Sequence, residues 1–273
     1  MGGAVTTWKG NTMSHASNRS GVRACLLVLV AMLAMSPLLA AAQESMSKNN
    51  VSTAWVVWPK AGQTQQFEAA VRKHAAWRKE AGEGFTWNIY QPIVGDDLAY
   101  YTIFSGGHTW ADFDDNQKWS TDSNATDAFN RDVGPLVERV SHYFYTNEDD
   151  ISHWNVTSQY PMYEVTRMKL APGQYGNFRA AVGKAREAAA AQKFGGNWLL
   201  RSVTGGSDDM TLVIPYGSYA DMAGPSPSFM EMMAAHMGGQ DKAVKNMTAI
   251  QSAIEGGDTT VYLHRPDLST PAD

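Results

Sequence analysis

The chain has 273 residues, and its 22 Lys and Arg against 27 Asp and Glu give a formal net charge of −5. An acidic chain without a basic run is a poor candidate for binding nucleic acid or an anionic membrane surface, because both require clustered Lys and Arg. The single cysteine, Cys25, lies in an N-terminal stretch with the character of an export signal. We therefore expect no disulfide, thiolate nucleophile or cysteine metal ligand in the mature protein.

Residues 1–42 have the pattern of a secretory signal peptide. They contain three basic residues and no acidic one, and an apolar run covers 24–35. The break at Ser36-Pro37 and the small residues up to Ala42 complete the pattern. The run is shorter than the roughly 20 apolar residues that a membrane-spanning helix needs. We expect cleavage after Ala42, export to the periplasm or the medium, no membrane attachment afterwards, and a mature net charge of −8.

The remainder of the chain contains two copies of one unit. A shift of 111 positions aligns 62–104 with 173–215 without a gap, and Trp87 then meets Trp198. An internal repeat of this length largely determines the fold.

In the first copy, hydrophobic periodicity and turn residues predict the order strand, helix, strand, strand, helix, helix, strand. The Gly95-Asp96-Asp97 sequence is typical of the turn between the second and third strands. The predicted elements cover 54–58, 65–80, 85–90, 98–104, 110–118, 127–139 and 140–146.

The second copy repeats this order, with a turn at 205–209 in place of the first copy's hairpin turn. The polar, turn-rich stretch between the copies is predicted to be a linker. Repeat 1 thus covers 52–147, the linker 148–161 and repeat 2 162–265. The predicted elements of the second copy cover 163–170, 174–192, 197–203, 210–215, 228–237, 241–255 and 259–264.

The strands are apolar on both faces, as in Trp55-Val56-Val57-Trp58, so the sheet needs a cover on each side. Helices cover one face of a ferredoxin-like βαββαβ unit, and the other copy's sheet is the simplest cover for the second face. Three features are typical of a known family: the order of elements in the repeat, the turns at Gly62 and Gly173 before the first helices, and the two hairpins with Asp-Asp turns. On these features the chain resembles the dimeric α+β barrel superfamily.

The resemblance covers about 52–265. It implies an α+β fold in which tandem ferredoxin-like βαββαβ repeats form a pseudo-dimeric α+β barrel. It leaves open whether the barrel closes within one chain or between chains, and so whether the protein is a monomer or a homodimer.

Tyr90 and Arg201 occupy equivalent positions in the two copies, so no shared structural demand explains both residues. They lie on the strand face opposite the matched tryptophans, because side chains alternate along a strand. We expect both to point into the barrel, where Arg167 of a neighbouring strand can join them. A buried guanidinium must be paired or must bind an anion. Pairing with a carboxylate such as Glu164 and binding of a ligand are the two alternatives.

Six histidines follow the predicted signal peptide, and no two have the i, i+4 spacing of a helical metal-binding pair. A buried or surface histidine without a chemical role is the alternative for each. If the protein is an enzyme, His74 on the first helix or His264 in the last strand is the candidate proton acceptor, with Arg201 holding an anionic oxygen.

A methionine-rich stretch surrounds His236 in the second copy. Thioethers and an imidazole could bind copper in an exported protein. Helical spacing nevertheless separates Met232 and His236 from the face formed by Met230, Met233 and Met237, and methionine also fills cores. Some relatives in the superfamily bind haem through a histidine on a helix of one half, so the resemblance also makes His236 a candidate haem ligand. The sequence favours packing of this methionine-rich helix in the core over a metal or haem site.

Two functional hypotheses follow. The first is an exported small-molecule-binding barrel, because aromatic walls with one cation suit a small aromatic or carboxylated ligand. The second is an enzyme on the same scaffold, and the resemblance implies a cofactor-independent monooxygenase or a haem-dependent oxidoreductase. Whether the chain is an enzyme, and whether it carries haem or no cofactor, stays open at this point.

Overall fold

A computed structural model describes residues 49–272 of the chain. The predicted signal peptide lies outside the described residues. Within the range 49–272, no helix is both long and apolar enough to cross a membrane.

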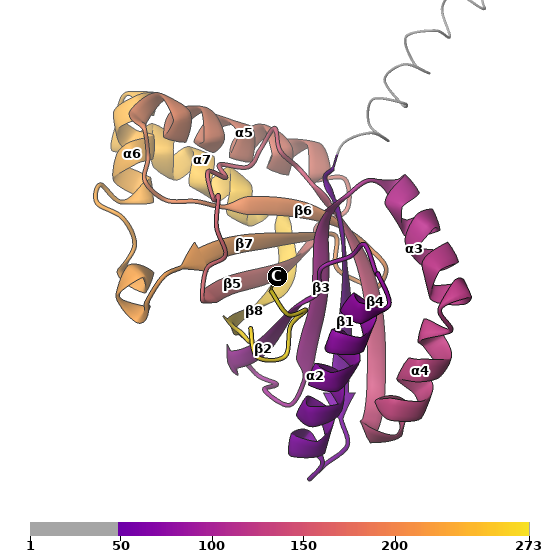
Figure 1. Cartoon of the computed structure of the whole chain (residues 1–273). Helices are drawn as coiled ribbons and strands as arrows, with labels where there is room; N and C mark the ends of the chain where they lie inside the picture. The colour runs from indigo at the N-terminus through magenta and orange to yellow at the C-terminus, as the bar shows by residue number, and fades with distance from the viewer. Residues whose placement is uncertain (1–48, 273) are drawn as a thin grey trace, which may run out of the picture. The chain divides into compact units, whose positions relative to one another are not determined.

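Two halves with the same order of strands and α-helices make up the structure (Figure 1). The first half contains β1 (Val51–Pro59), α2 (Thr64–Glu80), β2 (Asn88–Val94), β3 (Tyr101–His108), α3 (Trp110–Asp122), α4 (Ala125–Asp132), the 3₁₀ turn η1 (Gly134–Leu136) and β4 (Val137–Asn147). The second contains β5 (Met162–Leu170), α5 (Tyr175–Gln192), β6 (Leu199–Thr204), β7 (Met210–Tyr216), η2 (Tyr219–Ala223), α6 (Phe229–Met237), α7 (Gln240–Ser252) and β8 (Ile254–His264).

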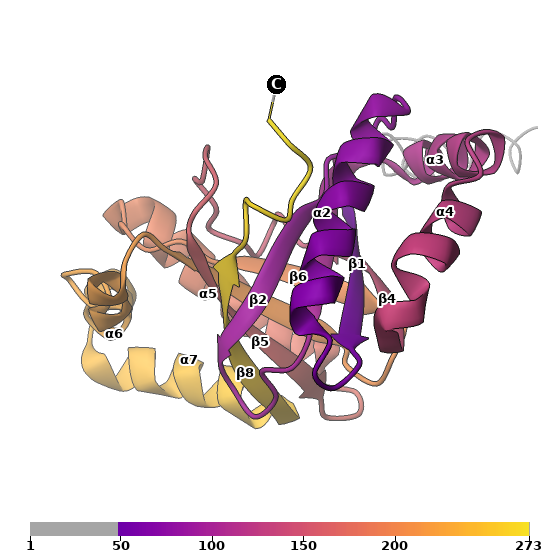
Figure 2. The same cartoon turned by 60° about the horizontal axis from the view of Figure 1, so that its bottom comes forward.

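The strands form one closed antiparallel barrel in the order β1-β3-β2-β8-β5-β7-β6-β4. Strand β2 pairs with β8, and β4 pairs with β6, so each half supplies four strands and the halves meet at two seams. Helices α2 to α4 lie outside one half and α5 to α7 outside the other (Figures 1 and 2). The predicted pseudo-dimeric α+β barrel is confirmed, and it closes within a single chain.

Side chains alternate between the barrel interior and the helix layers, as strand geometry requires. In the second half, Leu200 packs with Phe178 of α5, whereas the next residue, Arg201, faces the interior. In the first half, Ile89 packs with Phe67 of α2 in the corresponding way, and Tyr90 faces the interior. Each half therefore has a hydrophobic core outside the barrel, and the barrel interior forms a separate compartment.

Each half also sends a short segment into the core of the other. The first arm (148–153) follows β4 and packs on α5 and β6 of the second half, where Ile151 is buried. The second arm (265–270) follows β8 and packs on α2 and β2 of the first half, where Leu268 is completely buried. The segment predicted to be a linker thus begins as a packed element with its own core residue.

The two arms make the same hydrogen bonds. The Leu200 amide donates to Ser152 Oγ at 2.9 Å, and the Ile89 amide donates to Ser269 Oγ at 2.9 Å. A shift of 117 positions relates the two arms, compared with 111 for the earlier part of the repeat, because the second copy has six more residues before its last strand. The repeat therefore extends beyond the predicted strands and includes the arms.

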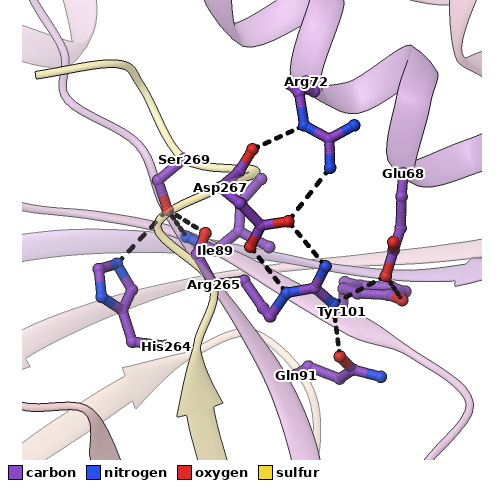
Figure 3. A network of polar contacts seen from close by, with 9 residues as sticks. All are labelled: Glu68, Arg72, Ile89, Gln91, Tyr101, His264, Arg265, Asp267 and Ser269. Carbon is purple, nitrogen blue, oxygen red and sulfur yellow. Dashed lines mark hydrogen bonds and ion pairs between the residues drawn. The ribbon is translucent and has the colours of Figure 1, made fainter.

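Charged residues reinforce the second arm (Figure 3). Arg265 pairs with Glu68 of α2 at 2.7 Å and with Asp267 at 2.8 Å. The Arg265 guanidinium also donates to Gln91 Oε1 of β2 at 2.7 Å, and Asp267 pairs with Arg72 at 3.1 Å. One guanidinium therefore connects the arm to the helix and to a strand of the opposite half.

Several predicted boundaries were wrong by three residues or more, and the two largest differences are the end of one helix and the start of the last strand. The helix predicted over 127–139 ends at Asp132, because Pro135 cannot donate an intrahelical hydrogen bond and disfavours helical geometry in the residue before it. The last strand begins at Ile254 and runs through two glycines that resembled a loop. A Cβ at Gly257 would lie 2.2 Å from the Arg167 carbonyl oxygen, so glycine permits the close approach of β5.

Shortening the buried side chain of the second arm should destabilise the protein. We expect Leu268→Ala to lower the free energy of unfolding by about 2–5 kcal/mol, because it removes a completely buried side chain and leaves a cavity. Urea denaturation at pH 7 measures this change. The control Leu98→Ala, at a half-exposed turn position, should change stability by less than about 0.5 kcal/mol. Equal, small effects of both substitutions would show that the arm does not complete the first-half core.

Candidate functional site

The barrel interior contains a cavity of about 450 Å³. Every strand of the barrel contributes inward-facing side chains, so the cavity depends on both halves. Its walls combine aromatic and small aliphatic residues with two arginines, and Asp208, in the turn between β6 and β7, adds a carboxylate. The strand residues that line it include Ala54, Val56, Asn88, Tyr90, Thr102, Phe104, Tyr143, Tyr145, Tyr163, Val165, Arg167, Arg201, Val203, Thr211, Val213 and Tyr262.

Arg201 is the central charged group of this barrel cavity. Its guanidinium carbon lies 5.0 Å from the ring centre of Phe104 and 6.0 Å from that of Tyr145. The Nε atom is buried without a hydrogen-bond partner, and among residues 49–272 no carboxylate forms an ion pair with the side chain. Burial lowers the pKa of Arg201, yet arginine keeps its proton in proteins. The cavity therefore contains a positive charge that forms no ion pair in the described part of the chain, and Asp208 is a carboxylate in the same lining.

Three phenols surround this charge. The side chains of Tyr90, Tyr145 and Tyr163 all interact electrostatically with Arg201. Burial raises the pKa of Tyr90 and the pKa of Tyr145 to about 12 each, and it also raises the pKa of Tyr163. The hydroxyl groups therefore remain protonated near neutral pH and can donate hydrogen bonds.

Arg167 also lines the barrel cavity, but its charge is satisfied. Its guanidinium pairs with Asp258 of β8 at 2.6 Å. Glu164, the carboxylate considered from the sequence, lies on the other face of β5 and accepts from the Tyr216 hydroxyl at 3.4 Å. The structure brings Tyr90, Arg167 and Arg201 to one cavity and gives a carboxylate partner to only one of the two arginines.

The segment after the first arm covers one side of the cavity. This covering segment (154–159) contributes Trp154 and Gln159, among others, to the cavity lining. Gln159 Nε2 donates to the Tyr90 hydroxyl at 2.6 Å. Sequence reasoning missed these residues because the stretch is polar and rich in turns. Trp154, a large aromatic residue in this polar stretch, was the sequence feature that could have indicated a buried segment.

The two candidate proton acceptors lie in different places. His74 is buried in the first-half helix layer, with its ring 5.4 Å from Trp77 and 5.6 Å from Phe129, and neither ring nitrogen has a partner. His264 lies at the end of β8, where its ring is 5.3 Å from Tyr90 and Nε2 is 3.4 Å from Ser269 Oγ. His264 is thus adjacent to a cavity residue, whereas His74 packs among aromatic residues in the core. A catalytic role for either stays a prediction.

His236 is exposed in the last turn of α6, while Met232 and Met233 of the same helix are buried in the second-half core. A second cavity, of about 630 Å³, lies between the outer face of the sheet and α5 to α7, and we call it the helix-side cavity. No histidine lines it or the barrel cavity. Within 49–272, no cluster of three metal-ligating side chains occurs. The donor groups at both cavities therefore do not fit a histidine-ligated haem.

Comparisons with known proteins show the fold. No protein-family model and no curated protein matches the sequence. A structure from Lactobacillus acidophilus NCFM, provisionally assigned as a monooxygenase, aligns with a TM-score of 0.50 at 10% identity, over 81% of this chain and 96% of that chain. A chlorite dismutase variant from Candidatus Nitrospira defluvii aligns with a TM-score of 0.50 at 9% identity, over 83% and 96%. Both are dimeric α+β barrel proteins, and the chain shares their fold.

The buried imidazole of His74 should make stability depend on pH. Burial lowers the pKa of His74 from 6.5 to about 4, with the positive charge of Arg78 as a second cause. The unfolded state therefore binds more protons between pH 6.5 and pH 4, and the free energy of unfolding falls as pH falls through this window. Between neutral pH and pH 4.5, we expect the free energy of unfolding of His74→Phe to fall by about 2 kcal/mol less than that of the wild type.

Urea denaturation at pH 7 and pH 4.5 measures the difference. Burial also lowers the pKa of His108, His142 and His264, so some pH dependence remains in the variant. His236→Gln, at an exposed position, is the matched control and should leave the pH dependence unchanged. A His74→Phe protein with the wild-type pH dependence would contradict the assignment.

Proposed function

We propose that the protein binds a small aromatic carboxylate in the barrel cavity. The observation that supports this proposal is Arg201, a charged guanidinium inside an aromatic cavity without an ion pair among residues 49–272. Burying a charge without a counterion is costly, and a ligand carboxylate would supply that counterion. A guanidinium and a carboxylate also match in geometry, because two parallel N–H groups can donate to two oxygens.

The remainder of the lining fits an aromatic ring. Phe104 and Tyr145 flank the guanidinium at 5.0 and 6.0 Å, and aliphatic side chains such as Val165 complete the walls. Ligand cavities of this kind are mostly apolar, with a few polar groups that orient the ligand. The volume of about 450 Å³ falls in the range of small-molecule sites, which begins near 300 Å³.

The three tyrosine hydroxyl groups can orient the ligand in the cavity. Tyr90, Tyr145 and Tyr163 are protonated near neutral pH and lie around the arginine, so they can donate hydrogen bonds to the ligand carboxylate. Gln159 already fixes the Tyr90 hydroxyl from the covering segment. Entry of a ligand would therefore be sensitive to the position of this segment.

Export forms part of the proposal. The basic region, apolar run and small residues of 1–42 favour a binding protein that acts in the periplasm or the medium. Such a protein would meet its ligand outside the cytoplasm.

Oxygenase chemistry in the same cavity is a second candidate. It is favoured by the shared fold with the Lactobacillus acidophilus protein provisionally assigned as a monooxygenase. Incubation of bound aromatic carboxylates in air, followed by mass spectrometry, tests it. An oxygenated product that forms with the wild-type protein and is lost with Arg201→Gln would support this candidate, and recovery of unchanged ligand would count against it.

Binding should depend on the arginine charge. We expect Arg201→Gln to weaken the binding of benzoate and phenylacetate, measured by calorimetry, by about tenfold or more, because a charge-assisted pair is lost. Arg201→Lys should retain part of the affinity but not the bidentate geometry. Arg186→Gln, on the exposed face of α5, is the matched control and should leave affinity unchanged.

A second readout separates binding from a structural role. Without ligand, Arg201→Gln should unfold at the same or a higher temperature than the wild type, because a buried charge without an ion pair is removed. Equal affinity for benzoate and benzamide, or equal affinity of the wild type and Arg201→Gln, would overturn the proposal. So would a wild-type protein that binds neither carboxylate at millimolar concentration.

A further inference from the structure

The helix-side cavity has a different composition from the barrel cavity. It lies on the outer face of the second-half strands, beneath α5 to α7, and its volume is about 630 Å³. Its walls are mostly aromatic and aliphatic. The residues that line it include Tyr160, Met168, Phe178, Val182, Ala185, Phe194, Trp198, Leu200, Leu212, Ile214, Tyr216, Phe229, Met247, Ile250 and Ile254.

Comparison of the two copies explains where the space comes from. The shift of 111 positions matches three small or slender residues of this lining with larger residues in the first half. The larger residues are buried in the first half. The pairs are His74 with Ala185, Phe85 with Gly196, and Tyr101 with Leu212.

Gly196 also lines the helix-side cavity. A Cβ at this position would lie 2.4 Å from the ring of Phe194, so the glycine allows that ring to lie against the backbone. Phe194 also approaches Trp198 and Phe229, with ring centres 6.4 and 6.1 Å away. Three aromatic rings therefore form one wall, in the half whose helix supplies the small Ala185.

The space is not required by the shared fold, because the first half fills the equivalent positions with the same backbone plan. Protein interiors are normally close-packed, and an empty apolar cavity destabilises a core. A large apolar cavity at positions where the other half has larger buried side chains is therefore best explained by a ligand.

The charges of the lining define that ligand. Neither lysine, arginine nor histidine lines the helix-side cavity, and its one carboxylate, Asp221, is exposed. Asp221 already accepts hydrogen bonds from the amides of Gly217 and Ser218. An anionic ligand would find no counterion here, and the carboxylates of haem would find none either.

We infer that the second half holds a binding site for a neutral, apolar organic molecule in the helix-side cavity. This site is independent of the barrel cavity, because the two lie on opposite faces of the same strands. Leu200 and Leu212 face the helices, whereas Arg201 and Val213 face the barrel interior. The inference therefore does not rest on the proposed function of the barrel cavity.

The neutral fluorophore N-phenyl-1-naphthylamine tests the inference on the full chain. We expect saturable binding to one site, with a rise in fluorescence on transfer from water. Ala185→Leu should weaken this binding about tenfold or more, because the added side chain enters the cavity. Leu212→Tyr introduces the larger residue that the first half has at the equivalent position, and it should weaken binding to a similar extent by filling the cavity from the strand side.

Ala191→Leu makes the same substitution at an exposed position of α5 and is the matched control, with wild-type affinity expected. Thermal melts establish whether each variant is folded. If one of the two cavity variants does not fold, the other still tests the inference. Fluorophore binding that survives both cavity substitutions, or that benzoate displaces, would overturn the inference. Stoichiometric hemin binding that Ala185→Leu abolishes would overturn the assignment of a neutral ligand.

Discussion

The mutual exchange of the two arms is the constraint on which the rest of the structure depends. Ile151 completes the core of the second half and Leu268 that of the first, and each arm aligns a serine with the opposite strand. Hydrogen bonds between β2 and β8 and between β4 and β6 close the barrel at the same two seams. The barrel cavity therefore exists only because both cores and both seams form together.

Within this nearly symmetric frame, function is carried by the positions where the copies differ. Arg201 occupies the position in the second half that Tyr90 occupies in the first, so this pair of positions gives the barrel interior one guanidinium and one phenol. Ala185 occupies the position of the buried His74, so the helix layer of the second half has a small side chain beside its cavity where the first half has an imidazole. The fold imposes the shared residues, and the unmatched pairs create two compartments of different polarity.

The fold and part of the site could be predicted from the sequence, for physical reasons. The repeat and the two-sided apolar strands imply a barrel, and strand alternation puts Tyr90 and Arg201 on its inner face. The packing of the arms could not be predicted, because a polar segment with one buried residue has no periodic pattern. Nor could the helix-side cavity, since small residues such as Ala185 are compatible with both close packing and open space.

The exchange of arms also governs the order of folding. The core of the first half needs Leu268, which lies about 200 residues after Phe67, and so it cannot be completed until almost the whole chain has been synthesised. Contacts of such high sequence separation slow folding, because the entropy of closing a long loop is lost before the contact forms. A nascent first half consequently exposes apolar surface throughout elongation and is the stage at which a chaperone would be required.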